Sequence, residues 1–431
     1  MTKDREVAAK ALLVGAPLKT SGFSDGKNHL VELSRLAMTA GAKVVGVVSQ
    51  NISKKNPRYL IGKGKIEELA VTVNSTTADL VIFDDELTPL QGKSIEDHLG
   101  VRVMDRSELI LDIFAKRARS REAKMQVELA QLQYLMPRLR RMWTHLSRIR
   151  GGIGLRGPGE TQLESDRRLI GRRITTLRKR LRALDKARLN RSKAREDEFQ
   201  VALVGYTNAG KSSLLRALSN RDVLVEDRLF STLDSKIRTV ELGDGFEAMV
   251  TDTVGFIRKL PHHLVASFRS TLEGIREAAL LVHVIDASQE EWSNQRVVVE
   301  EVLGTLGLEG IPQILVFNKI DSLQKEELID LKHRVRKEKQ PAVFVSALVI
   351  GSLEILKTAI RSYLQQSFRH LSMKLRASDG ESLAILHEAG EIVQQEYEGH
   401  FTTIEVRIPH KVAGRLLKSA DVVLLKEHGI T

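Results

Sequence analysis

The 431-residue sequence contains no cysteine. This absence excludes disulfides, thiolate zinc sites and cysteine catalysis. Long apolar runs are also missing: AALLVHVIDA at 278–287 contains a histidine and an aspartate and has about half the length that a membrane span requires. The first residues, MTKDREVAAKALLVG, lack the apolar core and small-residue cleavage site of a signal peptide. We therefore expect a cytoplasmic protein with no membrane span.

Proline is scarce, at nine residues, while 42% of the chain is hydrophobic and 28% is charged. Such a composition is typical of globular proteins and argues against large disordered regions. The length favours about three domains.

Positive charge is concentrated in one segment. Residues 138–195 contain 19 Lys or Arg and 4 Asp or Glu, a local excess of +15 in a chain whose net charge is +12. A local field of this kind indicates a polyanionic partner such as RNA, or else a solvated helix surface.

Residues 1–104 alternate short β-branched runs with helical patterns, which predicts a small parallel α/β domain. Within it, GKGK at 62–65 precedes a helix and is either an ordinary tight turn or a phosphate site that uses Lys63 and Lys65. The segment LVIFDD ends in two aspartates, as magnesium-binding strands of nucleotide sites do.

Residues 105–197 predict a helical hairpin that begins after Asp105 as N-cap. Apolar residues recur at steps of three and four from Leu129 to Leu146 and again from Ile170 to Leu184, which is heptad spacing. Pro137 is expected to kink the first helix. The stretch RGGIGLRGPGE would then be a tight turn at the tip of a basic arm, roughly 40 Å from the base of the hairpin. The candidate RNA contacts in this tip are Arg150, Gly154, Arg156, Gly157 and Gly159.

Residues 198–366 again alternate strands and helices, and residues 367–431 predict a small α+β domain with a helix at 381–399 and a strand at 402–409. The segment VALVGYTNAGKSSLL contains the phosphate-binding pattern G-x-x-x-x-G-K-S between a strand and a helix. Its backbone would wrap the phosphates, Lys211 would reach the β and γ oxygens, and Ser212 would hold Mg2+. The expected nucleotide contacts are Gly205, Tyr206, Thr207, Asn208, Ala209, Gly210, Lys211, Ser212 and Ser213.

Three further motifs follow at strand ends, in the order of a nucleotide switch. DTVG places Asp252 for the magnesium shell and Gly255 for the γ-phosphate. NKID places Asn318, Lys319 and Asp321 at the base, where the Asp321 carboxylate accepts from guanine N1 and N2 and so favours GTP over ATP. SAL adds Ser346 and Ala347 below the base.

Catalysis is expected to depend on Lys211, Thr232 and Gly255. In RLFSTLDSK, Thr232 is the candidate to close over Mg2+ and the γ-phosphate, with Ser231 as the alternative and Phe230 beside the nucleotide. Phe256 stands where many GTPases have the glutamine that orients water, which predicts slow intrinsic hydrolysis that a partner accelerates.

These motifs and the glycine-rich segment GGIGLRGPGETQLE resemble the HflX-type translational GTPases over most of the chain. The resemblance implies a multidomain α/β protein: a small α/β domain, an antiparallel coiled-coil hairpin, a Ras-like P-loop G domain and a small α+β C-terminal domain. It also implies a monomer that binds the 50S subunit and 70S ribosome through rRNA, is activated by the ribosome, and splits stalled ribosomes.

Two other functions stay open at this point. In one, the G domain is a timer and the N-terminal domain recognises a protein or mRNA. In the other, the N-terminal domain binds ATP near Lys63 and Lys65.

Overall fold

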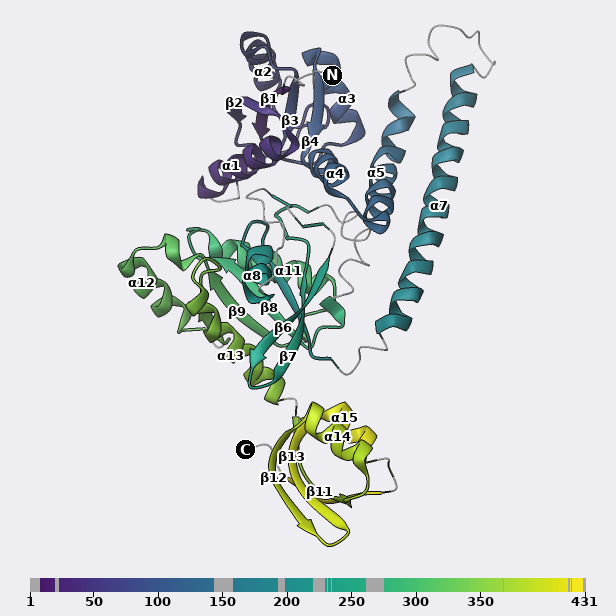
Figure 1. The fold of residues 1–431 in the computed structure, drawn as a ribbon. Coiled ribbons are helices and arrows are strands. Elements are labelled where there is room, and N and C mark those ends of the chain that lie inside the picture. Colours follow the sequence, from purple (N-terminus) through teal and green to yellow (C-terminus); the bar gives the residue numbers. More distant parts are fainter. Residues whose placement is uncertain are drawn as a thin grey trace, which may run out of the picture. The chain divides into compact units, whose positions relative to one another are not determined.

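The structure is a computed structural model that describes residues 8–19, 23–142, 158–192, 198–219, 229–230, 232–233, 235–260, 275–338, 340–366, 368–417, 419 and 421–428. The chain divides into two compact units. The first comprises the N-terminal domain, most of the helical hairpin and parts of the segments 225–235 and 253–273, and the second comprises the rest. Figure 1 shows the elements of both units.

The N-terminal domain is a four-stranded parallel sheet of order β2-β1-β3-β4, as the alternating pattern predicts. Buried side chains such as Leu12, Val81 and Phe83 form its core. The elements are β1 (Lys10–Gly15), α1 (Phe23–Ala40), β2 (Lys43–Ser49), α2 (Lys63–Thr76), β3 (Leu80–Phe83), α3 (Pro89–Leu99), β4 (Arg102–Asp105) and α4 (Arg106–Arg117).

Asp105 is the N-cap of α4, as expected, because its carboxylate accepts a hydrogen bond from the Glu108 backbone N–H at 2.9 Å. The helical pattern after it is interrupted, however: α4 ends at Arg117 and α5 (Arg121–Met142) begins as a separate helix. Helix α4 contacts both α1 and α5.

Helices α5 and α7 (Pro158–Ser192) run side by side in Figure 1. Leu129 of α5 packs with Ile174, Leu177 and Leu181 of α7, so these heptad positions form a seam between the two helices. The last two positions of the first pattern, Trp143 and Leu146, lie outside the described residues. Leu184, the last position in the pattern, is 36% exposed. The tip residues Arg150, Gly154, Arg156 and Gly157 lie outside the described residues, and Gly159 belongs to the start of α7.

The G domain contains a six-stranded sheet of order β10-β9-β8-β5-β7-β6, in which only β6 is antiparallel to its neighbour among the described strands. Its elements are β5 (Gln200–Gly205), α8 (Lys211–Ser219), β6 (Lys236–Gly243), β7 (Phe246–Asp252), β8 (Leu280–Asp286), α11 (Trp292–Thr305), β9 (Gln313–Asn318), the 3₁₀ turn η2 (Ile320–Ser322), α12 (Lys325–Val335), β10 (Ala342–Phe344) and α13 (Ile350–Gln366). Ligands of such sheets bind where the parallel strands end, which is where the sequence motifs lie.

The C-terminal domain is α+β, as expected, with an antiparallel sheet of order β12-β13-β11-β14. Its elements are β11 (Phe368–Arg376), α14 (Gly380–Ala389), β12 (Glu391–Glu398), β13 (Phe401–Pro409), α15 (His410–Leu416) and β14 (Val422–His428). The single helix expected over 381–399 is wrong in its second half. Gly390 is extended and ends α14, and EIVQQEYE then pairs with β13 as a strand, so tertiary pairing overrides the helical pattern.

None of the helices that the structure describes is long and apolar enough to cross a membrane.

Candidate nucleotide site

The phosphate-binding loop joins β5 to α8, the context that the motif requires. Gly205 has a φ of +151°, and a Cβ there would lie 2.2 Å from the Val284 carbonyl oxygen. Gly210 has a φ of +93°, and a Cβ there would lie 2.2 Å from Nδ2 of Asn318. The close packing of the loop against the ends of β8 and β9 therefore requires glycine at both positions.

Lys211 is buried at the first position of α8. Its Nζ donates to the carbonyl oxygens of Gly205 at 3.1 Å and Tyr206 at 3.0 Å. Burial lowers the pKa of Lys211 to about 8, although the Asp252 carboxylate opposes the shift. A phosphate bound in the loop would place negative charge next to the Lys211 ammonium and stabilise its charged form.

The two residues expected at magnesium meet directly. Ser212 Oγ donates to Asp252 Oδ2 at 2.6 Å, and both side chains are buried at the ends of α8 and β7. A hydroxyl and a carboxylate are oxygen ligands of the kind that Mg2+ prefers. The donor set therefore fits the ion: Ser212 would ligate it, Asp252 would hold its hydration shell, and the ion would neutralise phosphate charge there.

Asn318 connects the loops of the base site. Its Nδ2 donates to the Ala209 carbonyl at 2.9 Å, and its Oδ1 accepts from the Ala347 N–H at 3.1 Å. Ser346 Oγ in turn donates to Asp321 Oδ1. The structure thus brings together the phosphate loop, NKID and SAL, which the sequence only places in order.

Asp286, at the end of β8, is a candidate site residue that none of the sequence motifs above includes. Its Oδ2 accepts from Lys319 Nζ at 2.7 Å, and Lys319 itself has a left-handed φ of 63°. The ion pair holds the lysine beside the base loops. The signal in the sequence is HVIDAS, in which an acidic residue ends a buried strand.

Phe230, Thr232, Gly255 and Phe256 belong to the first unit. Phe230, Thr232 and Phe256 are all buried, and the Phe230 ring packs edge-on against Phe114 of α4 at 4.6 Å. The alternative residue Ser231 lies outside the described residues. The roles of Thr232 and Gly255 at the γ-phosphate stay predictions.

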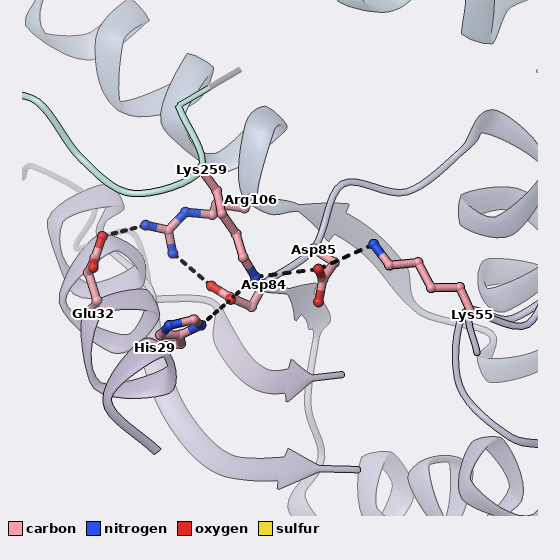
Figure 2. Close-up of polar contacts among 7 residues, drawn as sticks. All are labelled: His29, Glu32, Lys55, Asp84, Asp85, Arg106 and Lys259. Atoms are coloured by element: carbon pink, nitrogen blue, oxygen red, sulfur yellow. Dashed lines mark hydrogen bonds and ion pairs between the residues drawn. The ribbon is translucent and has the colours of Figure 1, made fainter. Parts of the chain in front are cut away.

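Asp84, after β3, lies in a cluster of charged residues that also includes Lys259, four residues beyond Gly255 (Figure 2). Its Oδ1 accepts from Arg106 at 2.7 Å and its Oδ2 from Lys259 Nζ at 2.6 Å. Burial raises the pKa of Asp84, but Arg106 and Lys259 outweigh it and hold the pKa below its ordinary value. Because the chain's own cations occupy this carboxylate, the geometry favours an ion pair over the magnesium site considered for LVIFDD.

Three family models match successive parts of the chain. A GTP-binding GTPase N-terminal model matches residues 27–115, its middle-region model matches 117–195, and a 50S ribosome-binding GTPase model matches 200–319. The chain is also 43% identical over 418 residues to "GTPase HflX" of Caldanaerobacter subterraneus, covering 96% of this chain and 94% of the relative. The chain belongs to the HflX family of GTPases.

A second HflX relative, from Alkalihalophilus pseudofirmus, is 40% identical and is covered over 96% of its length by 97% of this chain. Among solved structures, a GTP-binding protein from Sulfolobus solfataricus in complex with GDP is 25% identical, with a TM-score of 0.44, and the match covers 83% of this chain and 99% of that protein. As an HflX GTPase, the protein hydrolyses GTP to GDP and phosphate.

Proposed function

We propose that this HflX GTPase binds the large ribosomal subunit through its basic hairpin, is activated by it, and separates stalled 70S ribosomes into subunits. The observation that carries the proposal is the exposed basic surface of α7, together with the matched family model described as a 50S ribosome-binding GTPase. The exposed cations of α7 include Arg167, Arg168, Arg172, Arg178, Lys179, Arg180, Arg182 and Lys186.

Most of the charge on α7 stays exposed in the part of the hairpin whose side chains the structure describes. Arg173 makes a bidentate pair with Glu128 at 2.6 and 2.8 Å, which supports the hairpin seam. The cations listed above are exposed side chains, and each one that neutralises a phosphate releases counterions. The glycine-rich tip is proposed to approach rRNA closely, because glycines allow a backbone to come near a phosphate chain.

In this proposal GTP acts by shifting populations. With the γ-phosphate bound, Thr232 and Gly255 become ordered, and the protein favours the ribosome-docked state. Hydrolysis releases it. Because the buried Phe256 offers no polar group to orient water, the ribosome is expected to supply or reorder what hydrolysis needs.

The test measures the GTP hydrolysis rate alone, with 50S subunits and with 70S ribosomes, and repeats it after residues 151–160 are replaced by a short Gly/Ser loop. We expect ribosome stimulation in the parent chain and its loss in the loop variant. Equal stimulation of the parent chain and the loop variant would show that the tip is not needed for activation by the ribosome. If the protein co-sedimented equally with 50S subunits in GDP and in a non-hydrolysable GTP analogue, the nucleotide would not control ribosome binding.

A charge-matched comparison separates the hairpin from a general effect of charge. Arg178→Glu/Arg182→Glu changes two exposed residues of α7, and Arg334→Glu/Arg336→Glu changes two exposed residues at the end of α12 by the same charge. We expect only the α7 variant to weaken 50S binding and to flatten its dependence on salt. Equal weakening by both variants would contradict a specific role of the hairpin.

ATP binding by the N-terminal domain is kept as a second candidate because of one observation. An open cleft of about 460 Å³ lies beside the start of α2 and is lined by Lys19, Lys54, Lys55 and Gly62, among others. Lys65, which the sequence also suggested for this site, forms an ion pair with Glu68 at 2.7 Å and is not among these lining residues. Crosslinking of labelled ATP to the GDP-saturated full chain, and its loss in Lys19→Ala/Lys54→Ala, would support this activity.

A further inference from the structure

The outward face of the C-terminal sheet carries two histidines and a glutamate on three adjacent strands. His370 of β11 is the register partner of His428 on β14, and Ser372 of β11 is the partner of Glu405 on β13. Alternate residues of β11, such as Leu371 and Met373, are fully buried in the core. Since side chains alternate along a strand, His370 and Ser372 share the opposite face.

The three side chains converge on one point. Nε2 of His370 lies 2.7 Å from Glu405 Oε1, and Nε2 of His428 lies 3.7 Å from the same oxygen. The imidazole rings are stacked, with centroids 4.3 Å apart and planes 21° apart. The three possible ligand atoms all lie within 4.8 Å of one another. Ligands around a tetrahedral Zn2+ at about 2.0–2.1 Å lie roughly 3.3 Å apart, so small side-chain movements suffice.

Hydrogen bonding accounts for only part of this convergence. Despite its short contact with Glu405, Nε2 of His370 is buried and makes no hydrogen bond of acceptable geometry to any residue that the structure describes. Nε2 of His428 has Ser372 Oγ at 2.9 Å. A nitrogen lone pair that points at a carboxylate is unfavourable unless a proton or a cation lies between them.

The surrounding charges leave room for a cation. Arg407, opposite His370 on β13, lies 3.7 Å from Glu391, and Lys374 lies 3.6 Å from Glu398, so both are balanced by acids of β12. Lys426, the partner of Ser372 on β14, lies on the same face and opposes binding through its charge. Glu405 supplies the negative charge within the cluster.

We propose that His370, Glu405 and His428 form a Zn2+ site, with water as the fourth ligand and Ser372 as hydrogen-bond partner of that water. Two imidazoles and one carboxylate with an open position are a donor set that suits zinc and disfavours Mg2+, which prefers oxygen ligands. Each side chain is about one quarter exposed, so an ion can enter from solvent. Bound zinc joins β13, β11 and β14 and so fixes β14 to the sheet.

The test is equilibrium dialysis of Zn2+ against the full chain saturated with GDP and excess Mg2+, which occupy the nucleotide site. We expect one zinc ion per chain, and its loss in Glu405→Gln and in His370→Gln/His428→Gln. His400→Gln is the matched control, because His400 is an exposed histidine of the same domain. Co2+ bound in place of zinc should give the strong visible absorption of a tetrahedral complex in the parent and in the control only.

Thermal unfolding distinguishes a loss of zinc binding in a variant from a defect in its folding. Zinc should raise the melting temperature of the parent and of His400→Gln and leave that of Glu405→Gln unchanged, while all three hydrolyse GTP at the same rate without zinc. The proposal is overturned if the variants bind as much zinc as the parent, or if the parent binds none.

Discussion

Lys259 Nζ lies 2.6 Å from Asp84 Oδ2, although the two residues are 175 positions apart in the sequence. Lys259 follows the DTVG motif of the G domain sequence, whereas Asp84 ends a strand of the N-terminal domain. The contact ties the segment that follows DTVG to the N-terminal domain, and both belong to the first compact unit. Arg106 and Glu32 extend the same cluster into α4 and α1 (Figure 2).

The two ends of this ion pair should differ in energetic weight. Asp84 is 3% exposed and also compensates the buried Arg106, so Asp84→Asn should destabilise the N-terminal domain by about 3–5 kcal/mol. Lys259 is 39% exposed, so Lys259→Met should cost only about 0–1 kcal/mol. Urea unfolding of both variants measures the difference, and equal losses would show that Arg106 does not depend on Asp84.

Lys259→Met should instead loosen the segment after Gly255. Hydrogen exchange followed by mass spectrometry should show faster exchange of the backbone amides at 253–260 and unchanged exchange in β3. Lys55→Met is a control, because Lys55 approaches Asp85 at 3.5 Å from within the N-terminal domain. Faster exchange at 253–260 in the control as well would argue against a specific tie through Lys259.

Nucleotide binding should take up a proton in mildly alkaline solution. The pKa of Lys211 is about 8 when buried, and a bound phosphate favours its charged form and so raises that pKa. The bound state then holds more protons above pH 8, so GDP affinity should fall as pH rises. At about pH 8.5 the expected uptake is about 0.7 of a proton. Calorimetry in two buffers of different ionisation enthalpy measures it, and identical heats in both buffers would contradict the shift.

His283 should make the G domain sensitive to acid. It is buried in β8, and burial, with the nearby charges of Arg296 and Lys211, lowers its pKa to about 3. Between pH 6.5 and 3 the unfolded chain binds a proton that the folded chain does not, so stability falls as pH falls through this window. The expected loss between pH 7 and pH 5 is about 2 kcal/mol.

The measurement compares urea unfolding at the two pH values for the parent, His283→Leu and His400→Gln. The leucine variant should lose about 2 kcal/mol less between pH 7 and pH 5 than the parent, whatever its stability at neutral pH. The His400→Gln variant, which changes an exposed histidine, should behave as the parent does. An unchanged acid sensitivity in His283→Leu would show that other groups carry it.

Asp321→Asn should change the base preference from guanine to xanthine. In the predicted base site the Asp321 carboxylate would accept from guanine N1 and N2, whereas an amide would donate to the 2-carbonyl of xanthine and leave a guanine donor unpaired. GDP affinity should fall on the order of 100-fold or more. Competition of GDP and XDP for a fluorescent nucleotide measures the change, with the exposed Asp330→Asn on α12 as control. If Asp321→Asn still preferred GDP to XDP, Asp321 would not be the residue that recognises the base.

Local patterns were sufficient to predict the parts of the site that lie within one strand–loop–helix unit. The G-x-x-x-x-G-K-S loop, the strand ends with Asp252 and Asn318, and the heptad seam of α5 and α7 all depend on residues a few positions apart. Their backbone geometry follows from glycine, apolar periodicity and strand length. The second half of 381–399 shows the limit, because its residues become a strand only where β13 pairs with them.

The sequence by itself therefore determined the fold class, the GTPase motifs and the family. The tertiary structure decided which side chains meet across the chain: Lys319 with Asp286, Lys259 with Asp84, and His370 with Glu405 and His428. Such pairs leave no periodic signal, because strand order, register and the docking of loops bring them together, and each of these depends on the packing of the whole core.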